Sequence, residues 1–324
     1  MSERSWVSAH LFHHGDQDTV VVGVVGPVIE RLRRAGQADG FFFLRYWEGG
    51  PHVRLRVRTR PEHDRDVRAV IEETAAEFFR TSPSQSPMTE ADYAESAAQL
   101  AARERMPDYD RVLHPDNSLA FVDYVPETGV FGTGPALAAV EKQLMASSAL
   151  ALELIARGRT PGGRAADAFA MLAANRTLFT DILPELAYQA RFMSESGGAA
   201  ELLESPGFER YFEANKAQLR AGLESVWAAT RGATPPDASV VGSWLATVRE
   251  LDEALADAPS LPGPDGYPAA DAPADVLEHI NRLVPQLIVE RCAHLMCNRL
   301  GIAPAQESHL RLLLTRTAFD LCVV

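Results

Sequence analysis

The sequence predicts an α+β fold, in which an antiparallel sheet from the N-terminal third is packed with and extended by many helices. Two observations predict it. Short β-like runs are concentrated in residues 1–134, and from residue 135 onward apolar residues recur at helical spacing. No sharp boundary in composition separates these parts. We therefore expect a single domain over 1–324, sheet-rich over 1–134 and helical over 135–324.

The clearest strands form a hairpin. Residues 41–47 and 52–58 are short runs rich in aromatic or branched side chains, and Gly49 and Gly50 lie between them. We expect further strands at 6–13 and 118–127. The expected helices of the first part are a segment within 19–35, then 62–80 and 90–105. Those of the second part are 135–157, 164–177, 181–194, 206–230, 238–257, 274–300 and 304–318, with a Pro- and Gly-rich loop at 257–275.

Composition limits the classes of function. Of the 324 residues, 46% are apolar and 23% are charged, which is typical of globular proteins. No apolar run approaches the roughly 18 residues that span a bilayer, and the N-terminus lacks a signal-peptide pattern, so we expect a cytoplasmic protein without a membrane partner. The net charge of −13 argues against nucleic-acid binding. The cysteines at 292, 297 and 322 form no CxxC pair and predict no disulfide framework.

The second hairpin strand carries the first candidate site. Because side chains alternate along a strand, His52, Arg54, Arg56 and Arg58 share one face. Neighbouring arginines repel each other unless an anion or an acidic partner lies among them, and the guanidinium group is suited to bidentate binding of a carboxylate. An ordinary solvated polar face is the alternative that the alternation leaves open.

The second candidate site lies on the helix expected at 274–300. At helical spacing, one stripe is formed by Ile280, Val284, Leu287, Arg291, His294 and Asn298. A histidine can donate or accept a proton near neutral pH. With Arg291 and Asn298 one turn to either side, His294 is a candidate for proton transfer, although a buried core histidine is the alternative.

The third candidate is "DYVPETGVFGTG", residues 123–134, in which Glu127 follows a strand and precedes a glycine-rich segment. A simple loop is the alternative. The glycine spacing matches neither a phosphate loop nor a dinucleotide fingerprint. The histidines of "HLFHH" have no matching cluster of carboxylates or cysteines. We therefore expect neither a metal nor a cofactor.

These segments together resemble a known family. "WVSAHLF", "FFFLRYWEGGPHVRLRV", "YVPETGVFG" and "HLMCNRLGI" are similar, in order and spacing, to the C-terminal domain of lantibiotic dehydratases and to the stand-alone thiopeptide-type bacteriocin biosynthesis proteins. In full-length dehydratases this domain eliminates glutamate from glutamylated Ser or Thr in a precursor peptide. The resemblance implies that Arg54 and Arg56 bind the glutamate carboxylates and that His294 transfers a proton.

One position departs from the eliminating members. Val130 stands where the resemblance predicts arginine, and the sequence leaves open whether Arg45 or Arg291 compensates. Stand-alone relatives, the thiopeptide pyridine synthases, join two dehydroalanines in a formal [4+2] aza-cycloaddition and release the leader peptide. We therefore expect a cyclase. Glutamate elimination and non-catalytic binding of the precursor peptide are the alternatives.

The expected roles follow from this resemblance. The expected catalytic residues are His294, Tyr124 and Glu127. The expected substrate-binding residues are His52, Arg54, Arg56, Arg45, Arg291 and Asn298. The expected partners are a ribosomally made precursor peptide with its leader and other enzymes of the same biosynthetic cluster, and a homodimer is left open.

Overall fold

The computed structural model describes residues 4–179 except Ser86 and Arg105, then 206–232, 239–256, Leu261 and 274–322. The helix expected at 181–194 and nearly all of the loop expected at 257–275 lie outside these residues. The chain divides into two compact units, one of residues 1–126 with 144–159 and one of residues 127–143 with 160–324. The single-domain organisation stays a prediction.

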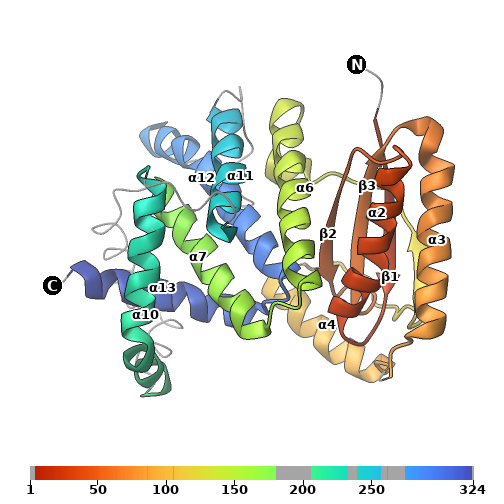
Figure 1. Cartoon of the computed structure of the whole chain (residues 1–324), viewed down its shortest axis with the longest axis horizontal. Helices are drawn as coiled ribbons and strands as arrows, with labels where there is room; N and C mark the ends of the chain where they lie inside the picture. The colour runs from red at the N-terminus through yellow and green to blue at the C-terminus, as the bar shows by residue number, and fades with distance from the viewer. Residues whose placement is uncertain are drawn as a thin grey trace. The chain divides into compact units, whose positions relative to one another are not determined.

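The first unit contains a four-stranded sheet in the order β2-β3-β1-β4, in which all neighbours are antiparallel (Figure 1). Its strands are β1 (Ser5–Phe12), β2 (Gly40–Tyr46), β3 (His52–Thr59) and β4 (Ser118–Phe121). This sheet and the many helices confirm the predicted fold class. The strand expected at 118–127 is shorter than predicted, because β4 pairs with β1 only opposite Ala9 to Phe12.

Strand alternation gives the sheet two different faces. On β3, Val53, Leu55 and Val57 are fully buried. Their face is covered by α1 (Gln17–Val20), a π-helical segment (Val21–Val25), α2 (Gly26–Arg34) and α3 (Asp64–Thr81) (Figure 1). The guanidinium of Arg68 on α3 lies 4.8 Å from the ring centroid of Phe121 on β4, which places α3 on this side. The opposite face carries the arginines of β3.

Helix α6 (Pro135–Ala156) protects an edge of this sheet. Strand β2 is an edge strand, and its Phe43 backbone N–H donates to the Ser148 hydroxyl at 3.2 Å. A free edge is a template for pairing with another chain, so this bond satisfies a donor that would otherwise be available. The hairpin turn before β3 is made by Gly49 and Gly50 at φ +77° and +107°, values that suit glycine.

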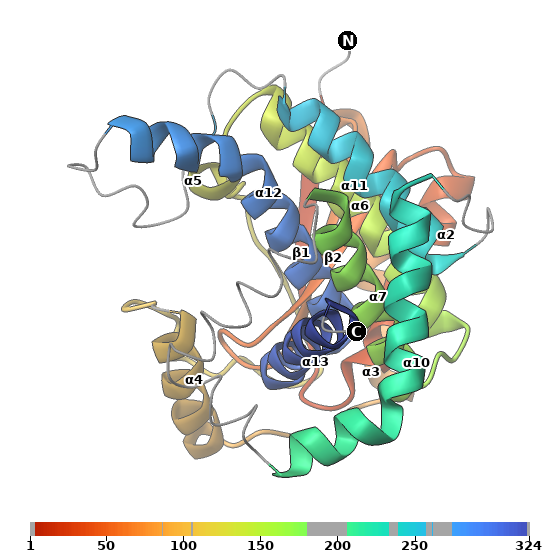
Figure 2. The same ribbon diagram turned by 90° about the vertical axis from the view of Figure 1, so that its left-hand side faces the viewer.

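The second unit is helical. It contains α5 (Thr128–Phe131), the start of α6, α7 (Pro161–Phe179), α10 (Pro206–Thr230), α11 (Val240–Ala256), α12 (Ala274–Arg299) and α13 (Pro304–Cys322) (Figure 2). Trp244 is fully buried in its core and donates to the Asn175 side chain at 2.9 Å. Asn175 in turn donates to the Val289 carbonyl at 3.2 Å, which links α7, α11 and α12.

Most expected helices appear within a few residues of their predicted ends, including α4 (Glu90–Glu104). The short helix α5 was not expected, because its "TGVF" carries no helical periodicity. The segment expected within 19–35 is interrupted by the π-helical turn at Val21–Val25. No helix among the described residues is long and apolar enough to cross a membrane.

The π-helical turn generates a prediction about stability. A Cβ added at Gly23 would lie 2.5 Å from two ring carbons of Phe78, so Gly23→Ala must displace a packed ring, and we expect a destabilisation of about 1–3 kcal/mol. Gly222→Ala on α10 meets nothing within 4 Å and should stabilise the protein by about 0.4–1 kcal/mol. Urea unfolding of both variants tests the pair. Equal effects of the two substitutions would contradict the packing argument.

Candidate functional site

We define the arginine face as the side of the sheet that carries His52, Arg54 and Arg56 on β3 and Ser8 and His10 on β1. The register places these residues opposite one another. Arg56 lies across from Ser8, Arg54 across from His10, and His52 across from Phe12. The alternation of β3 therefore brings together three of the side chains that the sequence predicted to bind substrate, and β1 adds two polar neighbours.

Arg54 is matched by a carboxylate of the chain itself. Its Nη2 lies 3.2 Å from Oε2 of Glu48, and its Nε donates to Nε2 of His52 at 3.2 Å. The guanidinium also lies 3.4 Å from the ring centroid of Tyr46, within the range of a cation–π interaction. Glu48 is held in place by the Asp110 backbone N–H at 3.0 Å. The charge of Arg54 is thus largely compensated within the protein.

Arg56 has a different environment. Its side chain contacts Nε2 of His10 at 3.3 Å and the Leu55 carbonyl at 3.4 Å, and no ion pair joins it to a carboxylate of the described residues. It is only 9% exposed. Burial, followed by the charge of Arg54, lowers its pKa to about 10. The hydroxyl of Ser8 directly opposite is buried and has no hydrogen-bond partner among the described residues. Unmatched buried polar groups are uncommon and often mark a functional position.

The two histidines of this face are neutral at neutral pH. Burial, then the charges of its neighbours His52, Arg56 and Arg54, lowers the pKa of His10 to about 2. Burial and the two arginines lower that of His52 to about 3. Nδ1 of His52 lies 2.8 Å from the Gly50 carbonyl, so Nδ1 carries the proton and Nε2 accepts from Arg54. The arginine face therefore holds two guanidinium cations beside two uncharged imidazole rings.

Two other predicted residues belong to the first unit. The ring of Tyr124 packs 5.2 Å from that of Trp6 and 6.0 Å from that of Phe42, and it interacts electrostatically with Arg56. Tyr124 thus lies beside the arginine face. Arg45 does not share that face. It alternates to the helix-covered side of β2, where its Nη2 lies 2.5 Å from Oδ1 of Asp18.

The remaining predicted residues belong to the second unit. Arg291 and His294 are exposed on α12, and Asn298, one turn further on, is half-buried. The His294 side chain is 47% exposed, which excludes the core-histidine alternative. Nη2 of Arg291 lies 3.5 Å from Oε2 of Glu127. Arg291 is therefore paired with Glu127, and Val130 lies three residues further along, in α5.

His294 has a partner that the sequence did not predict. Nδ1 of His294 lies 2.7 Å from Oε2 of Glu307, in the first turn of α13. The other oxygen of Glu307 accepts from Nε of Arg311 at 2.9 Å, and Arg311 also donates to Glu290 at 2.8 Å. The available sequence signal was the acidic residue at the start of the helix after "GIAP", because a first-turn carboxylate is favoured there. Ser8, His10 and Glu48 were also missed.

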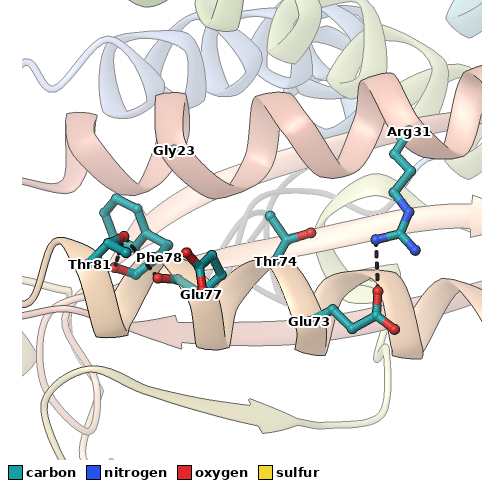
Figure 3. A pocket seen from close by; sticks show the side chains of 7 residues that line it. All are labelled: Gly23, Arg31, Glu73, Thr74, Glu77, Phe78 and Thr81. Carbon is teal, nitrogen blue, oxygen red and sulfur yellow. Dashed lines mark hydrogen bonds and ion pairs between the residues drawn. The ribbon is translucent and has the colours of Figure 1, made fainter.

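Other candidate sites contribute little. Burial raises the pKa of Cys292 and of Cys297 to about 12, so both thiols stay protonated. Within the described part of the chain, no three His, Cys, Asp or Glu side chains are grouped as metal ligands. A cavity of about 370 Å³ lies in the first unit between α3 and the π-helical and α2 segments, beside the Arg31–Glu73 ion pair (Figure 3). None of the predicted site residues lines it.

Comparisons with solved structures place this fold. The chain superposes on "Pyridine synthase, TbtD, from thiomuracin biosynthesis" with a TM-score of 0.76 and 21% identity, covering 98% of each chain. It matches TsrL with a TM-score of 0.62 and 16% identity, covering 100% of this chain and 96% of that one. It matches the tRNA-dependent lantibiotic dehydratase MibB from Microbispora sp. 107891 with a TM-score of 0.54 and 19% identity, covering 98% of this chain but 28% of MibB.

At these identities the likeness shows a shared fold. No curated protein sequence matches the chain. A family model, "Lantibiotic biosynthesis dehydratase C-term", matches residues 6–318 and so spans both units. The family resemblance seen in the sequence is thereby confirmed, and the chain belongs to the lantibiotic biosynthesis dehydratase C-terminal family, whose members modify ribosomally made peptides.

Proposed function

We propose that the protein is a cyclase that joins two dehydroalanines of a ribosomally made precursor peptide in a formal [4+2] aza-cycloaddition, giving a pyridine-type macrocycle. The family establishes peptide biosynthesis as the setting. The likeness to a pyridine synthase over 98% of both chains supports the proposal. The observation that carries it is the environment of Arg56.

Of the two arginines that the family resemblance singles out, Arg54 is matched by Glu48 and Arg56 is paired with no described carboxylate. A glutamyl leaving group brings its own carboxylate, and a clamp of several cations would hold it best. Val130, which stands where the family resemblance predicts a third arginine, adds no cation to such a clamp. A single buried guanidinium, with the Ser8 hydroxyl opposite, instead suits the neutral carbonyl oxygen of an amide, to which it can donate two hydrogen bonds.

The proposed reaction needs positioning and proton transfer. One dehydroalanine reacts through the imidic-acid tautomer of its amide, so that its alkene and the adjacent C=N bond form a 2-azadiene. The two terminal carbons of this azadiene add across the second alkene and form two C–C bonds. Loss of water and then of the leader peptide as an amide makes the ring aromatic, without an oxidant. Orienting two reacting groups can contribute about 7–11 kcal/mol in favourable cases.

In this proposal, His294 moves the protons of tautomerisation and departure, and Arg56 holds an amide carbonyl of the peptide. Tyr124 and Glu127 assist, and Arg54, His52, Arg291 and Asn298 shape the peptide-binding surface. Arg45 is left out, because it faces Asp18 on the other side of the sheet. Arg56 and His294 belong to different units, so each role needs its own variant.

Glutamate elimination is the second candidate, since a buried guanidinium without a carboxylate partner could also receive that of a glutamyl group. Incubation of the protein with a dehydrated, azole-bearing precursor and, separately, with its glutamylated form distinguishes the two. Mass spectrometry should show a macrocycle and a released leader from the first peptide and no change in the second. Loss of glutamate from the second would overturn the proposal, and binding of both without turnover would identify a non-catalytic subunit.

Arg56→Met tests the role of the buried cation. A hydrogen bond from a charged group is worth about 1.5–3 kcal/mol, so kcat/KM for cyclisation should fall by about 10- to 150-fold. Stability should hold or increase, because the variant removes a buried charge without an anionic partner. The control is Arg31→Met. Arg31 forms an exposed ion pair with Glu73, on the helices that cover the opposite face of the sheet, so its loss should leave cyclisation unchanged. A stable Arg56→Met protein with full activity would contradict the proposed contact.

The histidines of the arginine face predict how stability depends on pH. Their pKa values are lowered on folding, to about 2 for His10 and about 3 for His52, so below pH 6.5 the unfolded chain binds more protons. The free energy of unfolding should therefore fall as the pH drops from 6.5 to 5, with a slope approaching about 1.4 kcal/mol per pH unit for each histidine. Urea titrations at several pH values measure it. His52→Gln should flatten the slope, and an unchanged slope would argue against a neutral His52.

A further inference from the structure

We propose that Glu307 is the positioning residue of the site: it fixes His294 in the tautomer with the proton on Nδ1 and so makes Nε2 the atom that exchanges protons with the peptide. The inference rests on the proposed acid–base role of His294. It assigns a function to a residue that the sequence did not single out, and it specifies which nitrogen reacts.

The turn between α12 and α13 brings the two side chains together. Gly301 adopts φ +73°, and the N–H groups of Gly301 and Ile302 bond back to the Asn298 and Cys297 carbonyls, which closes the end of α12. Pro304 then begins α13, a position where its missing N–H costs nothing. Glu307 therefore lies in the first turn of α13, where the helix N-terminus stabilises a carboxylate.

The hydrogen bonds of Glu307 show that it is ionised. Burial alone would raise its pKa, but the hydrogen bond and charge of His294 and the charge of Arg311 outweigh burial, and the pKa is lowered. One of its oxygens accepts from Arg311 at 2.9 Å and the other lies 2.7 Å from Nδ1 of His294. A carboxylate can only accept, so Nδ1 must donate.

Arg311 is itself fixed. It bridges Glu307 and Glu290, from which its nitrogens lie 2.9 and 2.8 Å away. Burial would lower its pKa, but the two carboxylates outweigh burial and raise it, so it stays charged. The Glu307 side chain is only 8% exposed, whereas that of His294 is 47% exposed. The buried carboxylate thus orients a half-exposed ring, and no hydrogen bond joins Nε2 to another described residue.

Glu307→Gln tests this arrangement at almost constant volume. Nε of Arg311 still donates to the amide oxygen, so the amide NH₂ turns toward His294 and requires Nδ1 to accept. The proton then moves to Nε2, as occurs when an amide replaces the carboxylate of a catalytic triad. Glu209→Gln is the matched control, because Glu209 pairs with Arg316 at 2.9 Å elsewhere on α13.

The readout that separates positioning from folding is the ¹⁵N shift of the His294 ring, measured above neutral pH on full-length protein. Wild type and Glu209→Gln should show a protonated Nδ1, and Glu307→Gln a protonated Nε2. The cyclisation rate of Glu307→Gln should fall on the order of 10²-fold or more, the scale of an acid–base contribution.

Each outcome decides one claim. A wild-type protein with its proton on Nε2 overturns the role of Glu307, whether or not the variant folds. An inverted tautomer with an unchanged cyclisation rate also overturns it. A protonated Nδ1 in a wild-type protein that does not cyclise the dehydrated peptide supports the dyad, but it overturns the proposed function on which the catalytic role depends.

Discussion

The alternation of side chains along β3 is the constraint on which the rest of the first unit depends. One set of residues, Val53, Leu55 and Val57, is buried under α3 and its neighbours. The other set places Arg54 and Arg56 on the opposite face. A shift of one residue in register would exchange the two sets and bury the arginines in the apolar core. The same pairing that stabilises the sheet therefore also builds the candidate binding face.

The two arginines of the arginine face differ in how their charges are compensated. Arg54 is shared between Glu48, His52 and the ring of Tyr46, whereas Arg56 has a neutral His10 and a backbone carbonyl as neighbours. Keeping a cation buried beside uncharged groups costs folding free energy. A ligand that supplies the missing acceptor would offset this cost. The two candidate reactions differ in that acceptor, which is an amide carbonyl in cyclisation and a glutamyl carboxylate in elimination.

Much of this could be predicted from the sequence, for identifiable reasons. Period-two alternation with Gly49-Gly50 predicts the hairpin, and the glycine and proline of "GIAP" predict the break between α12 and α13. The pairing of Arg54 with Glu48 could not be predicted, because it depends on how the hairpin turn is oriented. The contact of His294 with Glu307 could not be predicted either, because it joins two helices across a turn. The position of Arg45 on the helix-covered side depends on the strand register, which only the folded sheet defines.

The most direct test of the central claim is a competition within one molecule. A precursor peptide that carries both the pair of dehydroalanines and a separate glutamylated serine would be incubated with the wild-type protein and followed by mass spectrometry. The account predicts a macrocycle that retains its glutamyl group and has lost its leader. A linear product that has lost glutamate would contradict the account and would make Arg56 a carboxylate-binding residue.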